Sequence, residues 1–375
     1  MGKSSKDKRD AYYRLAKEQG WRARSAFKLL QLDEEFDLFQ DVTRVVDLCA
    51  APGSWSQVLS RVLIKGEKFG RSAWEDKQET ARQAFLQQSK SESIPPDSST
   101  DSAKATVQES TEPTEPTKAE SALQPPKDIK IVAIDLQPMA ALQGIITLRA
   151  DITHPATVPL LLENLGSAKA DLVLSDGAPD VTGLHDLDIY VQSQLLFAAL
   201  NLALCVLRPG GKFVAKIFRG RDVDLLYAQL KLFFETVVVA KPRSSRASSV
   251  EAFVVCLNFQ PPEGYHASLS EPLNVEQLET MVNAKSGTKE ALINSSSSTE
   301  TRADGVVEVE TNSDPDRWIA PFLACGDLSS FDADATYHLP KDRITLDPVQ
   351  PPTAPPYKRA LEMRKEAGGA YGKTT

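Results

Sequence analysis

The sequence is poor in cysteine and histidine, with four residues of each among 375. The cysteines are far apart and form no C-x-x-C pair, so neither a disulfide framework nor a structural zinc site is expected. The histidines show no ligand spacing, and we predict that the protein binds no metal. Three of the cysteines lie inside apolar runs, which is typical of small core residues in a reducing compartment. The four are Cys49, Cys205, Cys256 and Cys325.

Long apolar runs are also missing. The longest, near Leu195–Leu207, is interrupted by Asn201 and is predicted to be too short to span a bilayer. The N-terminus carries charges but no apolar segment of the kind found in secretory signals. We therefore expect a soluble cytoplasmic protein that does not enter a membrane.

The net charge of −8 argues on its own against a nucleic-acid partner. This average hides an uneven distribution, because residues 1–31 contain nine Lys or Arg and only three acids. A local basic patch on an acidic chain is compatible with a phosphate-rich partner.

Two segments are too polar to form a core. Between residues 89 and 125, thirteen of 37 residues are Ser or Thr and five are Pro, and residues 267–316 are similarly polar. Such compositions cannot bury enough apolar area to offset chain entropy. The abruptly hydrophobic stretch Arg317–Leu328 comes next and is expected to dock onto the domain or onto a partner. The predicted parts are a frayed basic N-terminus (1–10), a main domain (11–265) with a disordered insertion (about 66–127), a low-complexity linker (266–316), a hydrophobic docking segment (317–340) and an extended C-terminal tail (341–375).

Strand-like and helix-like segments alternate along the main domain. Short β-branched runs predict strands, and longer runs with helical spacing predict helices. This alternation is typical of an α/β fold, in which helices cover both faces of a largely parallel sheet. Predicted strands span residues 44–49, 129–135, 145–149, 170–176, 212–218, 236–240 and 252–258, and predicted helices span 11–36 (as two helices), 54–64, 160–165, 190–207 and 224–232.

Acidic residues follow the predicted strands: Asp47, Asp135 and Asp176 end three of them, and Asp151 follows a fourth. In an open α/β sheet, ligands bind at the carboxyl ends of the strands. The turn after Asp47 consists of small residues and leads into a helix, which places backbone N–H groups beside these acids. It is not G-x-G-x-x-G, and the sequence has no P-loop lysine. A ligand with adenosine and ribose but no pyrophosphate fits better, and S-adenosylmethionine is such a ligand.

Two lysines and a glutamate suggest a second feature of the site. Lys216 interrupts the apolar run Phe213–Phe218, where a covered strand normally has an apolar residue. Lys28 lies on a basic helix, and Glu251 opens the last strand. Each also has an ordinary explanation. The long side chain of Lys216 can extend past apolar neighbours, Lys28 can lie on a solvated helix face, and a glutamate such as Glu251 is common at the start of a strand. Together with Asp176 they would form a polar cluster at one end of the sheet.

Four segments resemble, in the right order, motifs of the FtsJ-like RNA 2′-O-ribose methyltransferases. The resemblance extends from Lys6 to about Asn258, apart from the polar insertion. It implies a Rossmann-like, class I S-adenosylmethionine-dependent methyltransferase with a mostly parallel seven-stranded sheet and helices on both faces. The four segments are Asp47–Gln57, Ser175–Asp180, Val214–Phe218 and Lys241–Phe253.

The N-terminal helix and the stretch Trp318–Leu328 resemble the eukaryotic tRNA branch of this family, which methylates riboses of the anticodon loop. This implies tRNA as substrate, at positions 32 and 34, and partner proteins of WD-repeat or helical-repeat type that select the nucleotide. Trp318–Leu328 is the candidate docking element for such a partner. Two alternatives stay open: an enzyme of the same family that acts on rRNA or an mRNA cap, and a non-catalytic RNA-binding scaffold.

The resemblance also implies the site residues. Many family members have Gly-Gly where this chain has Gly53-Ser54, and Ser54 is expected to serve as the N-cap of the following helix. The implied catalytic residues are Lys28, Asp176, Lys216 and Glu251, with Lys216 as proton acceptor, and the implied cofactor contacts are Gly53, Trp55, Asp135, Asp151 and Asp176.

The chemistry of the reaction explains why a lysine is needed. A ribose 2′-hydroxyl is a poor nucleophile, and a base beside it assists methyl transfer. Lysine is a base only when its pKa, about 10.4 in water, is lowered. We expect burial and the charge of Lys28 to lower the pKa of Lys216. Asp176 opposes this change and is expected to hold Lys216 and to face the sulfonium, while Glu251 is expected to fix Lys28 or to bind the ribose.

Basic residues of the N-terminal helices and of the segment before the last strand are expected to contact RNA phosphates. Such contacts give an affinity that falls with salt, and they do not read sequence. For each of them a merely solvated position is the alternative. The predicted contacts are Arg22, Arg24, Lys241, Arg243 and Arg246.

Overall fold

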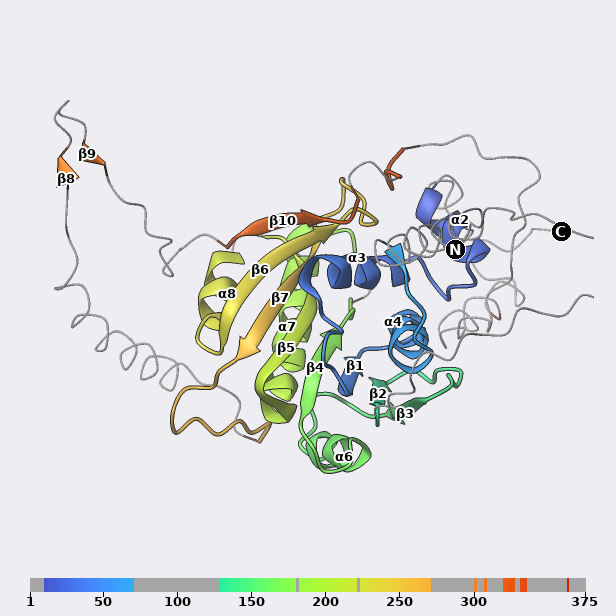
Figure 1. Ribbon diagram of the computed structural model, residues 1–375, viewed down its shortest axis with the longest axis horizontal. Coiled ribbons are helices and arrows are strands. Elements are labelled where there is room, and N and C mark those ends of the chain that lie inside the picture. The colour runs from blue at the N-terminus through green and yellow to red at the C-terminus, as the bar shows by residue number, and fades with distance from the viewer. Residues whose placement is uncertain are drawn as a thin grey trace, which may run out of the picture. The chain divides into compact units, whose positions relative to one another are not determined.

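The computed structural model describes residues 10–70, 128–179, 182–220, 223–270, 300–301, 307–308, 320–327, 331–335 and 363. The chain divides into two units: Met1–Glu67 with Ile129–Thr375, and Lys68–Asp128. The first unit contains the central sheet (Figure 1). Nearly all of the predicted insertion and of the C-terminal tail lies outside the described residues.

The central sheet has the order β10-β6-β7-β5-β4-β1-β2-β3 (Figure 1). All of its pairings are parallel except those of β7, which runs antiparallel to β5 and to β6. The predicted mostly parallel α/β sheet is thus confirmed. The strands are β1 (Arg44–Leu48), β2 (Lys130–Asp135), β3 (Ile145–Arg149), β4 (Ala170–Ser175), β5 (Leu207–Phe218), β6 (Phe234–Pro242), β7 (Glu251–Phe259) and β10 (Phe322–Cys325).

The predicted number of seven strands is wrong, because β10 adds an eighth. It comes from the hydrophobic segment expected to dock, and it pairs in parallel with β6 from Phe322↔Val239 to Cys325↔Pro242. An uncovered edge strand would leave a row of N–H and C=O groups without partners, and β10 satisfies those of β6. Inside the predicted linker the structure describes a separate two-stranded pair, β8 (Glu300–Thr301) with β9 (Val307–Glu308).

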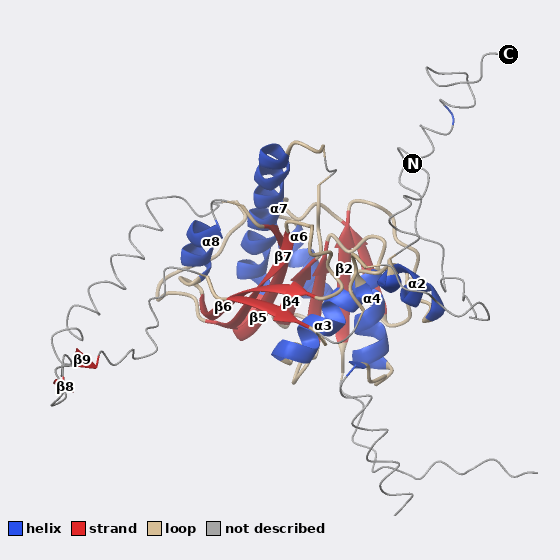
Figure 2. Cartoon of the chain, turned by 90° about the horizontal axis from the view of Figure 1, so that it is seen from above, coloured by secondary structure: helices blue, strands red, loops and turns tan. Residues whose placement is uncertain are grey.

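Helices cover both faces of the sheet, as predicted. In the view from above, α3 and α4 lie on one face, and α6, α7 and α8 lie on the other (Figure 2). α4 continues into a turn of π-helix, η1, so that the two together match the single helix predicted for residues 54–64. The helices are α2 (Ala11–Glu18), α3 (Ala26–Phe36), α4 (Ser54–Leu59), η1 (Ser60–Ile64), α6 (Thr157–Asn164), α7 (His185–Val206) and α8 (Val223–Leu230).

The long helix α7 begins five residues before its predicted start. The carboxylate of Asp188 accepts hydrogen bonds from the backbone N–H groups of Thr182 (2.8 Å) and Gly183 (3.1 Å), which fixes the entry into its first turn. With 22 residues, α7 is long and apolar enough, by length and composition alone, to cross a membrane. The apolar residues of its second half, among them Leu196 and Leu200, belong to the hydrophobic core formed with the sheet.

The predicted fraying of residues 1–10 is wrong at Asp10, which is 1% exposed. Its Oδ1 accepts a hydrogen bond from the N–H of Tyr12 at 3.0 Å and so caps α2. Its Oδ2 pairs with the guanidinium groups of Arg24 and Arg246, the latter at 3.3 Å. A buried carboxylate between two arginines ties α2 to α3 and to the loop between β6 and β7. Residues 1–9 lie outside the described part of the chain.

Candidate active site

Three carboxylates meet at the carboxyl ends of the central strands. Asp47 lies in β1 and is fully buried, Asp135 ends β2, and Asp176 directly follows β4. Because β1 lies between β2 and β4, its acid lies between the other two. Burial, together with the charges of Asp176 and Asp135, raises the pKa of Asp47 to about 7. The sheet therefore concentrates negative charge where the sequence predicted a cofactor.

The small-residue turn after β1 is held by hydrogen bonds to Asp135 and Arg22. Asp135 Oδ2 accepts from the N–H of Ala51 at 2.8 Å. Arg22 donates to the carbonyls of Pro52 (2.9 Å) and Ala140 (3.0 Å) and is only 7% exposed. At Gly53, with φ +93°, an added Cβ would lie 2.3 Å from Nη1 of Arg22. Only glycine fits there, and Arg22, which was predicted to contact RNA, is a buried support of this turn.

Two other predictions about this turn need correction or refinement. Gly53, and not Ser54, is the N-cap of α4; the hydroxyl of Ser54 donates to the carbonyl of Ala23 at 3.1 Å instead. Trp55 is 2% exposed, and its Nε1 donates to the carbonyl of Ser25 at 2.9 Å. The indole therefore fastens α4 to α3, and the backbone is the part of Trp55 available to a ligand at the helix N-terminus.

Asp151 lies just beyond β3 and is exposed. Its Oδ1 accepts hydrogen bonds from the backbone N–H (2.9 Å) and the hydroxyl (2.8 Å) of Thr153, and these bonds lower its pKa. Since β3 is parallel to β2, Asp151 belongs to the same edge of the sheet as Asp135. Asp135 and Asp151, two of the three acids predicted to bind the cofactor, are thus at the ends of neighbouring strands.

The four predicted catalytic residues come together in one charged cluster. Nζ of Lys216 lies 2.7 Å from Oδ1 of Asp176 and 3.6 Å from Oε2 of Glu251. Lys216 also donates to the backbone carbonyl of Asp176 at 2.9 Å. Nζ of Lys28 lies 2.6 Å from Oε1 of Glu251. Four residues from α3, β5, β7 and the end of β4 therefore form a chain of alternating charges.

The predicted lowering of the Lys216 pKa is wrong for the protein without ligands. Burial lowers this pKa, but the negative charges of Asp176 and Glu251 outweigh burial and raise it. For Glu251, burial is likewise outweighed: the charges of Lys28 and Lys216 lower its pKa to about 2. Near neutral pH, Glu251 is therefore a carboxylate and Lys216 an ammonium ion.

Sequence reasoning missed a direct partner of this cluster. Ser245 is 5% exposed, and its hydroxyl donates to Oε1 of Glu251 at 2.7 Å. It lies inside the motif Lys241–Phe253, but one serine among four in that stretch carries no signal of its own. Its place next to Glu251 depends on the loop that joins β6 to β7.

The predicted RNA contacts other than Arg22 lie around the β6–β7 loop. Lys241 donates to the carbonyls of Ser249 (2.5 Å) and Glu251 (3.1 Å), so it holds the loop from within. Arg243 faces Asp332 at 3.7 Å. Arg24 and Arg246 share Asp10. The basic residues are thus gathered on one surface, where they are partly neutralised by acids of the protein itself.

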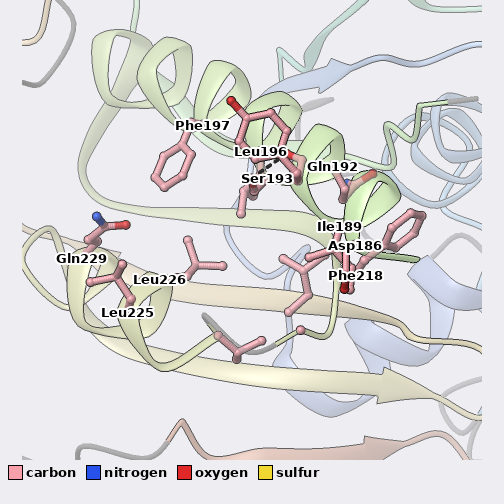
Figure 3. A pocket seen from close by; sticks show the side chains of 14 residues that line it. Asp186, Ile189, Gln192, Ser193, Leu196, Phe197, Phe218, Leu225, Leu226 and Gln229 are labelled. Atoms are coloured by element: carbon pink, nitrogen blue, oxygen red, sulfur yellow. Dashed lines mark hydrogen bonds between the residues drawn. The ribbon is translucent and has the colours of Figure 1, made fainter. Parts of the chain in front are cut away.

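A cavity of about 620 Å³ lies beside the site, between α7, the end of β5 and α8 (Figure 3). Its lining is mostly aliphatic and aromatic and includes Phe197, Phe218 and Leu226. None of the four charged residues of the cluster lines it. Gln192, at the active-site end of the cavity, belongs to both regions, because it contacts the backbone of Lys216.

The sequence is similar to proteins of known activity over this whole region. The family model described as FtsJ-like methyltransferase matches residues 21–87 and 119–259. A Schizosaccharomyces pombe protein named tRNA (cytidine(32)/guanosine(34)-2′-O)-methyltransferase is 50% identical over 97% of this chain and 98% of its own length. A Homo sapiens protein of the same name is 45% identical over 98% of this chain and 86% of its own length. A Gallus gallus pre-rRNA 2′-O-ribose RNA methyltransferase is 33% identical over 72% of this chain and 26% of its own length.

Proposed function

The chain belongs to the FtsJ-like methyltransferase family, and from this premise we propose that it methylates ribose 2′-hydroxyls in the anticodon loop of tRNA, using S-adenosylmethionine. The observation that carries the proposal is the cluster of Lys28, Asp176, Lys216 and Glu251 beside the strand-end acids. A scaffold that only bound RNA would have no need for two buried lysines paired with two half-buried carboxylates.

Positions 32 and 34 of tRNA are the targets that similarity supports best. The Schizosaccharomyces pombe and Homo sapiens proteins named for these positions match nearly the full length of this chain. The pre-rRNA enzyme of Gallus gallus matches this chain over only 26% of its own length. This difference favours tRNA over rRNA as the substrate class.

The residues at the strand ends fit S-adenosylmethionine, which when bound supplies an electrophilic methyl group on a sulfonium cation. Burial is the main cause of the Asp47 pKa of about 7, and the charges of Asp176 and Asp135 raise it further. A cationic ligand beside Asp135 and Asp176 would relieve the part that is due to repulsion. The turn at Gly53 leaves no Cβ in the way of such a ligand. In our proposal, Asp135 and Asp151 hold hydroxyl and amino groups of the cofactor, and the backbone at Gly53 and Trp55 approaches it closely.

We propose that Lys216 accepts the proton of the ribose 2′-hydroxyl. Its ammonium form is favoured while both carboxylates act on it, so a base role requires this pKa to fall when the site fills. A cation beside Asp176 offsets the charge of that carboxylate and lowers the pKa of Lys216 again. Glu251 pairs more closely with Lys28 than with Lys216, because its carboxylate lies 2.6 Å from Nζ of Lys28 and 3.6 Å from Nζ of Lys216. Lys28 thereby limits the contact between Glu251 and Lys216.

We further propose that partner proteins of repeat type select the nucleotide in the cytoplasm and that β10 is part of their docking site. After pairing with β6, β10 still exposes 51% of Phe322 and 37% of Leu323. Exposed aromatic and aliphatic side chains at a sheet edge are suited to contact with another protein. Replacing both by Ser should weaken methylation at a partner-selected position while leaving cofactor affinity unchanged.

The function is tested by mapping 2′-O-methylation across total RNA from cells with and without the protein. Loss at positions 32 and 34 of tRNA is the expected result. Loss confined to rRNA or to mRNA caps would mean that the protein methylates those RNAs instead. An unchanged methylation map would mean that the protein is a non-catalytic RNA-binding scaffold. The purified protein, mixed with unmodified tRNA and labelled cofactor, tests the same reaction directly.

A further inference from the structure

The backbone ladder between β4 and β5 ends just before the catalytic residues. The last register pair is Ser175↔Ala215, and Asp176 and Lys216 are the next residue on each strand. Lys216 stays inside β5 and pairs with Phe253 of β7, whereas Asp176 lies one residue beyond the end of β4. The distance between the two catalytic side chains is therefore not set by the ladder itself.

The side chain of Gln192, which projects from α7 (Figure 3), bridges β5 at Lys216 and the segment that follows β4. Its Nε2 donates to the carbonyl of Lys216 at 2.9 Å and to the carbonyl of Gly177 at 3.1 Å. Both hydrogens of the amide are thus used, one for the carbonyl of Lys216 in β5 and one for the carbonyl of Gly177, just beyond β4. Because the two partners are carbonyl oxygens, the NH₂ group and not the oxygen must face them.

Gln192 makes this bridge from a buried position. The residue is 2% exposed, and its Oε1 accepts no hydrogen bond from the described part of the chain. An unsatisfied buried oxygen is costly, and a leucine or methionine would avoid the cost in a mostly apolar helix. Its presence indicates that the two donated bonds matter for something other than packing.

The peptide that Gln192 holds is confined from the other side as well. Lys216 donates to the carbonyl of Asp176, and Gln192 donates to the next carbonyl, that of Gly177. A Cβ added to Gly177 would lie 2.9 Å from Cβ of Cys49. The segment that carries Asp176 is therefore fixed by hydrogen bonds to the carbonyls of Asp176 and Gly177 and by the close approach of Gly177 to Cys49.

We propose that Gln192 is a positioning residue for methyl transfer, which sets the distance between Asp176 and Lys216 by bridging β5 and the segment that follows β4. This inference rests on the proposed function. Without the bridge, Asp176 moves away from Lys216 part of the time, so that Lys216 is misplaced and loses one of the two charges that raise its pKa. Misplacement of a reacting group by about 1 Å can cost about 10²-fold in rate.

The test uses full-length Gln192→Met, which has similar volume and no donor, and Gln192→Glu, which has the same shape but places oxygens against the two carbonyls. For both, kcat with tRNA should fall roughly 10- to 100-fold, while KM for tRNA and Kd for S-adenosylmethionine stay within about threefold. In Gln192→Met the rising limb of kcat against pH should move to lower pH, because Asp176 raises the pKa of Lys216 less. Single-turnover rates per cofactor-binding molecule correct for any unfolded fraction.

The matched control is Ser193→Ala, the next residue of α7, whose hydroxyl donates only to the carbonyl of Tyr190 in its own helix; it should have parental kinetics. The inference is overturned if both Gln192 variants keep kcat within threefold of the parent. It is also overturned if kcat falls in Gln192→Met but the rising limb of kcat against pH does not move, because Gln192 would then have a purely structural role. A parent enzyme without tRNA methylation would overturn the proposed function and, with it, this inference.

Discussion

Nζ of Lys216 lies 2.7 Å from Oδ1 of Asp176 and 2.9 Å from the carbonyl of the same residue. One aspartate therefore fixes the lysine through its backbone and its side chain together. The same contact raises the pKa of Lys216, so the group that positions the proposed base also keeps it protonated. For Lys216 to act as a base, the negative charge of Asp176 must therefore be offset when the site is filled.

Replacement of Lys216 by Met should abolish methyl transfer and leave cofactor binding nearly intact. Removing the proposed proton acceptor should cost about 10²- to 10⁴-fold in kcat, whereas the residues proposed to hold the cofactor, Asp135, Asp151 and the turn at Gly53, are unchanged. Methylation of purified tRNA and calorimetric titration with S-adenosylmethionine measure the two effects separately.

Lys212→Met is the matched control, since Lys212 lies on the same strand. Its ammonium donates to the carbonyls of Asp37 (2.6 Å) and Leu38 (3.0 Å) and takes no part in the cluster. This variant should lose some stability but keep its turnover per folded molecule. Turnover of Lys216→Met within threefold of the parent would remove Lys216 as the base.

The rate should rise with pH if Lys216 accepts the proton. The pKa of Lys216 is raised in the protein without ligands, so the neutral amine is scarce at pH 7 and its share increases tenfold per pH unit below that pKa. We expect log kcat/KM, which reports on the free enzyme, to rise with a slope near +1 between about pH 6 and pH 9. A flat profile would contradict the base role and would indicate that Lys216 acts as a positioning cation.

Much of this site could be predicted from the sequence, because its residues stand in motifs with fixed spacing. The acids at the strand ends and the lysine inside an apolar strand follow from position along a parallel sheet. The pattern of residues predicted that Lys28 and Glu251 could join Asp176 and Lys216 in a polar cluster, but their catalytic roles were inferred only from family resemblance. Each of these two residues, considered alone, resembled an ordinary surface charge.

What the sequence could not predict depends on contacts between distant segments. Arg22 looked like a phosphate contact because it lies in a basic helix-rich segment, yet it packs against Pro52 and Ala140, the latter 118 residues away. Asp10 looked frayed because its neighbours are polar, yet two arginines bury it. The sign of the Lys216 pKa shift also depended on a balance, since burial and two carboxylates act in opposite directions.

The loop between β6 and β7 should contribute to RNA affinity through Arg243. Its guanidinium is 3.7 Å from the carboxylate of Asp332, which competes with RNA phosphates for it. Arg243→Ala should weaken tRNA binding and reduce the slope of log K against log salt by about 0.7, the value for one phosphate contact on a single strand. Asp332→Asn should have the opposite effect on affinity at low salt.

Fluorescence anisotropy of a labelled anticodon stem-loop at several salt concentrations measures both changes. Lys231→Ala is the control, because Lys231 lies just after α8 and donates to the carbonyl of Glu235. An unchanged slope in Arg243→Ala, equal to that of the control, would exclude Arg243 from the phosphate contacts.

The buried acid Asp47 should make the protein less stable as the pH rises. Burial raises its pKa to about 7, well above the value of 3.8 expected for the unfolded chain. Between these two values the native state binds a proton that the unfolded state has lost, so the free energy of unfolding falls with increasing pH, by up to about 1.4 kcal/mol per unit. Asp47→Asn removes this term, and its stability relative to the parent should therefore increase from pH 4 to pH 7. Urea unfolding followed by the fluorescence of the buried Trp21 and Trp55 measures the difference.

Asp171→Asn provides a control of opposite sign. Burial raises the pKa of Asp171, but hydrogen bonds from Arg208, Thr43 and Arg44 outweigh burial and lower it. The stability that Asp171 contributes is thus complete above pH 4 and is lost only in stronger acid. Its replacement should destabilise the protein by a constant amount between pH 5 and pH 7, while the effect of Asp47→Asn changes across the same interval. Parallel pH curves for the parent and Asp47→Asn would show that Asp47 is ionised throughout, and a cation would then be needed beside it.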